Sequence, residues 1–228
     1  MWKTLYACLW ALLGAGACQA AELSTLEQRW LQGIAPVVAF ARLTHFPLDI
    51  VVQPQPTPGL TPMGMAFDDG RCTLVLSMRE NPLTHELLDR IEPDLFDATL
   101  ELMAAHELGH CERYLSGQFA RLPAGFGAGA SGPDSGEGSQ AQHLQVVQRE
   151  EGFADIVGLA WTQHRHPELY AALHAWLSAK RGADESRGSA HDTTPWLQLV
   201  RDGAVLADPA LFVNAAVVWR LGLIGLAL

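Results

Sequence analysis

The chain is short of basic residues and of cysteines, and no uncharged apolar run reaches the roughly 20 residues of a membrane span. Lys and Arg number 15 against 25 Asp and Glu, so the formal net charge is −10. This balance argues against nucleic acid or an anionic membrane surface as the main partner. Because 49% of the residues are hydrophobic and only 18% are charged, a mostly disordered chain is excluded as well. A chain of 228 residues is expected to form one elaborated domain with a substantial core.

Residues 1–20 are predicted to be a secretory signal peptide, which leaves 21–228 as a single mature domain. Met1–Lys3 form a short positively charged start, and an uncharged apolar run follows from Thr4 to Gly16. Small residues come next, as at a cleavage site. The protein is therefore expected to be exported, either to a periplasm or out of the cell.

Cys18 offers a second interpretation of the same segment, as a site of lipid attachment. It follows small residues, although the usual lipidation motif has Leu three positions before the cysteine and this chain has Ala15 there. Membrane attachment is expected only if Cys18 carries lipid. Both interpretations place the protein where disulfides form, and Cys72 and Cys111 are then the available pair. Two buried free thiols are the alternative.

The pattern of apolar residues predicts an α+β domain that is mostly helical and has a small sheet. Ser24 and Glu27 are spaced as a capping box at the start of the first helix. The last helix carries Asn214 and Arg220, which favours a packed core helix over a membrane span. Helices are predicted over 24–40, 83–91, 93–116, 142–163, 169–180 and 211–228, strands over 48–52 and 72–78, a flexible Gly-rich loop over 124–139 and a polar loop over 182–190.

The sequence His106-Glu107-Leu108-Gly109-His110 lies inside the predicted helix 93–116. Residues four apart share one face of a helix, so His106 and His110 can present two imidazoles to one ion. Imidazole is a good zinc ligand. Glu107 is next to the first histidine and is suited to act as a general base on a zinc-activated water. A surface His/Glu pair without metal is the alternative.

A second helix offers the sequence Glu151-Gly-Phe-Ala-Asp155. Glu151 and Asp155 are four apart, share a face and are aligned with apolar residues, and carboxylates in such surroundings need a partner. Zinc would be that partner for Glu151, and Asp155 could accept a hydrogen bond from the second ring nitrogen of a ligating histidine. Glu150 is the nearest rival ligand, but it has no matching residue four positions later. Two solvated acids are the alternative.

The two motifs together resemble the gluzincin metallopeptidases, specifically the family of HtpX and the CAAX prenyl endopeptidases. In that family His-Glu-x-x-His is followed downstream by Glu-x-x-Ala-Asp, and the resemblance covers roughly residues 70–195. It implies a zincin-like domain with one catalytic Zn²⁺ held by His106, His110 and Glu151. It also implies Glu107 as the catalytic base and Asp155 as a residue that supports a ligand.

The family's His-Pro near the end of the domain, with an Arg one or two turns later, has a weaker counterpart here. His191 is followed by Asp192-Thr-Thr-Pro195, and Arg201 comes ten residues after the histidine. His191 is expected to stabilise the oxyanion formed during hydrolysis. The alternative is a loop histidine beside a turn.

The sequence therefore predicts an exported zinc endopeptidase that acts on peptides or unfolded proteins. Strand 72–78 is expected to be the edge strand to which an extended substrate adds. A Cys72–Cys111 disulfide would tie that strand to the helix just after His110. A zinc-binding envelope protein without catalysis, a chaperone or scaffold that keeps the fold, is the first alternative, and an envelope interaction protein is the second. An intact Glu107 favours the enzyme.

Overall fold

A computed structural model describes residues 22–53, 61–121, 136–183 and 186–226. The fold is α+β, with helices dominating a small sheet, as predicted. The signal peptide 1–20, Cys18 and most of the Gly-rich loop 124–139 lie outside the described residues. Short 3₁₀ turns precede α3, α5 and α7. The main elements are α1 (Thr25–Leu43), β1 (Leu48–Val52), β2 (Met63–Asp68), β3 (Arg71–Leu76), α2 (Pro82–Leu88), α3 (Phe96–Leu115), α4 (Gly136–Arg165), α5 (Tyr170–Arg181), α6 (Thr194–Leu199) and α7 (Leu211–Leu226).

Most predicted helices are present with shifted ends. Ser24 caps α1 and accepts a hydrogen bond from the Glu27 backbone, while the Glu27 carboxylate accepts one from the Ser24 backbone, so the capping box is confirmed. Gly117 follows α3 with a φ of +66°, which glycine adopts without strain. The predicted flexible loop was wrong over 136–139, which belong to α4. A glycine costs a helix only about 1 kcal/mol, and a long packed helix can extend through such residues.

The sheet corrects the prediction about the substrate edge. Its order is β1-β3-β2, with β1 parallel and β2 antiparallel to β3, so the strand predicted over 72–78 is central and paired on both sides. The apolar composition that made this strand conspicuous suits a strand buried among neighbours. β2 is an edge strand and was not predicted. It connects to β3 through Asp69 and Gly70, whose φ angles are +41° and +72°.

Cys72 of β3 and Cys111 of α3 form a disulfide, as predicted. Both residues are fully buried. The bond joins the central strand to α3 one residue after His110, so the sheet and the helix with the two histidines are covalently linked. Free thiols, the alternative, are not what the structure contains.

Replacing both cysteines by alanine is expected to lower the free energy of unfolding by about 2–4 kcal/mol. The bond spans 39 residues of sequence, and without it the unfolded chain gains the entropy of an open loop. Urea unfolding of the oxidised protein and of the Cys72→Ala/Cys111→Ala variant measures the loss. A reductant should lower the stability of the wild type alone. Equal midpoints for oxidised wild type and variant would contradict the prediction.

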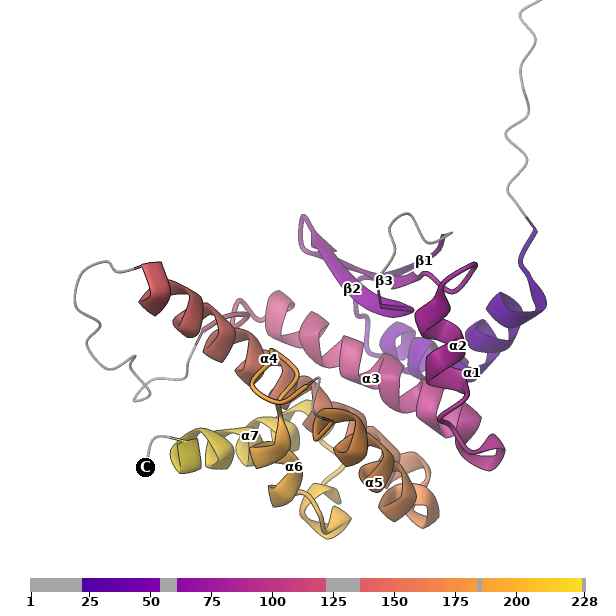
Figure 1. Ribbon diagram of the computed structural model, residues 1–228. Helices are drawn as coiled ribbons and strands as arrows, with labels where there is room; N and C mark the ends of the chain where they lie inside the picture. Colours follow the sequence, from indigo (N-terminus) through magenta and orange to yellow (C-terminus); the bar gives the residue numbers. More distant parts are fainter. Residues whose placement is uncertain (1–21, 54–60, 122–135, 184–185, 227–228) are drawn as a thin grey trace, which may run out of the picture.

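Helix α3 runs through the middle of the molecule (Figure 1). The sheet, α1 and α2 lie on one side of it, and α4 with α5, α6 and α7 lies on the other. Glycines bring α3 and α4 close together. A Cβ on Gly109 would lie 3.0 Å from the Ala154 Cα, and one on Gly158 would lie 2.9 Å from the Leu102 carbonyl oxygen. This close approach places side chains of the two helices within reach of one ion.

Helix α7 is the predicted C-terminal helix, and it packs on α4 and α6. Ala215 and Trp219 are buried on its inner face, and the Trp219 indole donates a hydrogen bond to the Arg149 carbonyl. None of the helices in the described part of the chain has both the length and the apolar character needed to span a membrane.

Candidate metal centre

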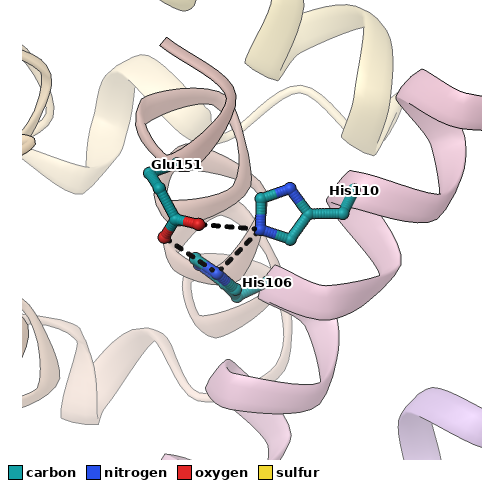
Figure 2. A group of neighbouring side chains, drawn as sticks. All are labelled: His106, His110 and Glu151. Carbon is teal, nitrogen blue, oxygen red and sulfur yellow. Dashed lines mark hydrogen bonds and ion pairs between the residues drawn. The ribbon is translucent and has the colours of Figure 1, made fainter. Parts of the chain in front are cut away.

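Three side chains from α3 and α4 point toward one another between the two helices (Figure 2). The Nε2 atoms of His106 and His110 are 3.2 Å apart. Glu151 of α4 presents Oε2 to His106 Nε2 at 3.5 Å and Oε1 to His110 Nε2 at 3.4 Å. The three side chains are only 11–13% exposed. The residues predicted as zinc ligands thus lie together.

The two imidazole nitrogens have the spacing of two ligands on one tetrahedral zinc ion. Ligand atoms about 2.0–2.1 Å from such an ion are about 3.3–3.4 Å from each other, because each pair forms one edge of the tetrahedron. The two Nε2 atoms are 3.2 Å apart, close to that edge, and the Glu151 carboxylate reaches each of them with a different oxygen, at 3.4 and 3.5 Å. Two imidazoles and one carboxylate are also a donor set that zinc accepts, and three protein ligands leave a fourth position for water or substrate.

Asp155 lies behind His106, as the sequence predicted. Its Oδ1 is 2.8 Å from His106 Nδ1, which leaves Nε2 of that ring free to face the ligand triangle. The fully buried carboxylate also accepts hydrogen bonds from the Thr193 hydroxyl and from the Arg181 guanidinium. A histidine held in this way has a fixed orientation and a more basic metal-binding nitrogen.

Arg181, the last residue of α5, was missed by the sequence analysis. Its guanidinium makes two hydrogen bonds to Asp155, at 2.7 and 2.9 Å, and reaches Glu151 Oε2 at 3.4 Å. The side chain is 13% exposed. It therefore offsets part of the negative charge of two buried carboxylates. The only sequence feature that hinted at it is its place in the basic last turn of a helix.

The charges at the centre shift the pKa values of its members. Burial alone would raise the pKa of Glu151, but the hydrogen bond from His110 and the charges of His106, His110 and Arg181 outweigh it and lower the pKa to about 2. Burial would lower the pKa of His106, but Asp155 and Glu151 outweigh it and raise the pKa. Negative potential that favours a proton on an imidazole also favours a divalent cation in its place.

Two further predicted residues border a cavity beside the ligands. Glu107 and His191 both line it, together with His106. The Glu107 carboxylate has no hydrogen bond or ion pair with any described residue. His191 Nε2 lies 3.6 Å from Glu151 Oε2, and its side chain is 48% exposed. Burial lowers the pKa of His191, so its imidazole is neutral at neutral pH. One carboxylate and one imidazole are thus available to a molecule that enters the cavity.

Two rival candidates lie elsewhere. Glu150 is buried in an ion pair with Arg113, at 2.6 Å, and accepts a hydrogen bond from the Ala120 backbone. Consecutive helical residues point about 100° apart, so Glu150 cannot share the face of Glu151. Arg201 is exposed and borders a different, smaller hollow with His174. Neither residue belongs to the candidate centre. Larger hollows, such as one of about 780 Å³ beside Trp161, hold no such group of ligands in the described parts of the chain.

No family model, curated protein or solved structure matches this chain. The assignment of the centre therefore depends on its own geometry. On the His110 ring, Nδ1 is buried without a hydrogen-bond partner in the described structure, while Nε2 faces His106 Nε2 and the Glu151 carboxylate.

Replacing Asp155 by asparagine is expected to weaken zinc binding about 10- to 100-fold. Asparagine removes the negative charge that orients His106 and pairs with Arg181. Competition with a chromogenic chelator measures the affinity. Asp49→Asn is the matched control, because Asp49 is half exposed and pairs with Arg71 at the surface. An affinity equal to that of the control would contradict the role given to Asp155.

Proposed function

We propose that the protein is a zinc-dependent endopeptidase that hydrolyses peptide bonds in peptides or unfolded proteins. The observation that supports this most is the group of His106, His110 and Glu151, in which two imidazole nitrogens lie 3.2 Å apart and the carboxylate reaches both. Beside it is Glu107, whose carboxylate has no hydrogen bond or ion pair with a described residue. A site for structural zinc would normally have four protein ligands. Among the described residues the donor set has three members, and the space next to it is a cavity lined by Glu107.

A zinc ion held by these residues would supply Lewis acidity, which lowers the pKa of water and polarises a carbonyl group. Glu107 is then placed to accept a proton from water and to transfer it to the leaving amine. Asp155 and Arg181 would keep His106 and Glu151 in position during these transfers. His191, a neutral imidazole at the cavity, would donate a hydrogen bond to the oxygen of the scissile carbonyl as negative charge develops there.

The substrate would lie along β2 rather than along the central strand. The Ser77 N–H donates a hydrogen bond to the Pro62 carbonyl. Because hydrogen-bonded pairs alternate along an antiparallel ladder, the even-numbered residues of β2 are the ones that exchange hydrogen bonds with β3. The backbone N–H and C=O groups of Met63 and Met65 therefore point away from β3, toward the open edge. No described strand covers that side. An extended peptide can add there through main-chain hydrogen bonds, which explains how unrelated sequences would be accepted. The start of β2 borders the same cavity as His106.

The N-terminal sequence extends the proposal to the cellular location. A signal peptide over 1–20 would export the enzyme to a periplasm or out of the cell, and lipid on Cys18 would tether it to a membrane. The Cys72–Cys111 disulfide is consistent with an oxidising compartment.

A comparison of the wild type with Glu107→Gln tests the proposal. The wild type should contain about one zinc per chain and degrade unfolded casein, and a chelator should abolish the activity. Glu107→Gln should keep its zinc and its unfolding midpoint but lose about 10²- to 10⁴-fold in kcat, because the proton acceptor is gone. Zinc-loaded wild type that degrades casein no faster than the variant would refute the peptidase. Wild type purified without chelators and still free of zinc would refute the metal centre.

A further inference from the structure

We infer that the cavity beside His106 selects substrates with a large apolar side chain at one of the two positions that flank the cleaved bond. This inference rests on the proposed function, and it names the class of substrate that the same centre would take. The cavity has a volume of about 340 Å³. That is at the lower end of the range of about 300–1,000 Å³ for sites that hold a small ligand. It suits one large side chain better than a folded partner.

The walls of this cavity are mostly apolar. They come from α2, α3 and α5, and the side chains that form them are Leu83, Leu87, Leu102, Met103, Trp176 and Leu177. Leu87, Leu102 and Leu177 belong to the buried core, so this part of the wall is rigid. Trp176 and Met103 are half-buried and contribute a flat ring and an adaptable thioether. A polar or charged side chain would lose its water here without gaining partners along these walls.

The polar residues of the cavity lie at two places. Glu107, His106, Asp155, Arg181 and His191 mark the end next to the candidate metal centre. Thr61, Glu86 and Lys180 are on the rim, and Glu86 is paired with Arg90 in the solvent. The distribution resembles a ligand site in which a few polar groups orient the reacting atoms and apolar walls select what is attached to them.

The edge strand gives the direction in which a peptide would cross this cavity. Pro62 and Met63, at the start of β2, line the cavity together with His106. Near the other end of β2, Phe67 stacks on Tyr114 and contacts Phe119. The centroid of the Phe119 ring lies 6.4 Å from that of the His110 ring. A peptide along β2 therefore passes from the His106 side to the His110 side. Alternate side chains of an extended peptide point to the same face. When the cleaved peptide bond lies over the metal ligands, the side chain of a residue next to that bond can therefore enter the cavity.

The experiment compares quenched fluorescent peptides that differ at one position next to the cleaved bond. Wild type should cleave peptides with Leu or Phe there at least about 10-fold faster, in kcat/KM, than peptides with Ala, and Asp should be worse than Ala. The preference should appear at one flanking position. Equal rates for Leu, Ala and Asp at both flanking positions would overturn the inference, although cleavage itself would uphold the proposed function.

Two variants connect the preference to this cavity. Leu83→Trp narrows it and should reduce the ratio of Leu to Ala rates about 10-fold. Trp176→Leu enlarges the cavity and should favour Phe over Leu. Val213→Ala is the control, because Val213 is 67% exposed on α7, away from the cavity. Unchanged ratios in both folded cavity variants would overturn the inference.

A binding measurement separates failure of this inference from failure of the chemistry. Zinc-loaded Glu107→Gln should bind the Leu peptide at least about 10-fold more tightly than the Ala peptide. The fluorescence anisotropy of a labelled peptide measures this binding. Equal affinities would overturn the cavity's role even if the wild type is an active peptidase. Selective binding without any hydrolysis by the wild type would instead uphold the cavity and refute the proposed activity.

Discussion

Glu151→Gln is expected to lower zinc affinity by at least about 100-fold and, with it, all metal-dependent hydrolysis. Glutamine has the shape of glutamate, but it lacks the charge that attracts the ion and that pairs with Arg181 and the two histidines. The loss should exceed the 10- to 100-fold effect typical of residues that only support a ligand. Zinc content after dialysis and chelator competition measure the change.

Glu107→Gln is the matched control for this prediction. It makes the same chemical change on the carboxylate of Glu107, which lines the cavity but does not belong to the ligand triangle. Its zinc affinity should stay near that of the wild type. Similar zinc affinities in the two variants would show that Glu151 is not a ligand.

Replacing Glu150, the residue next to Glu151, by alanine should instead lower the free energy of unfolding by about 3–5 kcal/mol. Glu150 is 4% exposed and accepts two hydrogen bonds from the Arg113 guanidinium. Without the carboxylate, the Arg113 guanidinium, which lies 4.4 Å from the Trp219 ring centroid, stays buried and uncompensated. Urea unfolding of the zinc-free proteins measures the loss.

The control for Glu150 is Glu168→Ala, an exposed glutamate near the start of α5, where a change within about 0.5 kcal/mol is expected. Zinc affinity of the folded Glu150→Ala protein should be close to that of the wild type. A variant with normal stability and lost zinc would reverse the roles assigned to the two adjacent glutamates.

The parts of the centre that were predictable obey helical spacing. His106 and His110 are four apart in one helix and Glu151 and Asp155 are four apart in another, so each pair faces one way whatever surrounds it. That the two pairs meet follows from the close crossing of α3 and α4, where Gly109 contacts Ala154. The sequence alone indicated this meeting only through resemblance to a known pair of motifs.

Arg181 and β2 show what local patterns leave out. Arg181 reaches Asp155 from a third helix, and no fixed sequence spacing relates residues on separate helices. β2 has mixed composition and follows a proline-rich segment, so its alternation was weak. Asp69-Gly70 was a usable hint, since two such residues commonly close a hairpin and imply a strand before them as well as after. The central strand was mistaken for an edge because its place in the chain before the helix with the two histidines does not say which strands pair with it.

The disulfide and the candidate metal ligands connect different layers of the molecule. Cys111 fastens α3, and hence both histidines, to the sheet, whereas Glu151 belongs to α4 on the opposite side. An ion bound by all three would connect two layers that are otherwise held together by packing, hydrogen bonds and the Arg113–Glu150 ion pair. Zinc occupancy would then report the spacing of the layers, because coordination tolerates displacements of only about 0.2 Å. Substitutions far from the cavity that spread α3 and α4 apart should therefore release the metal before they unfold the protein.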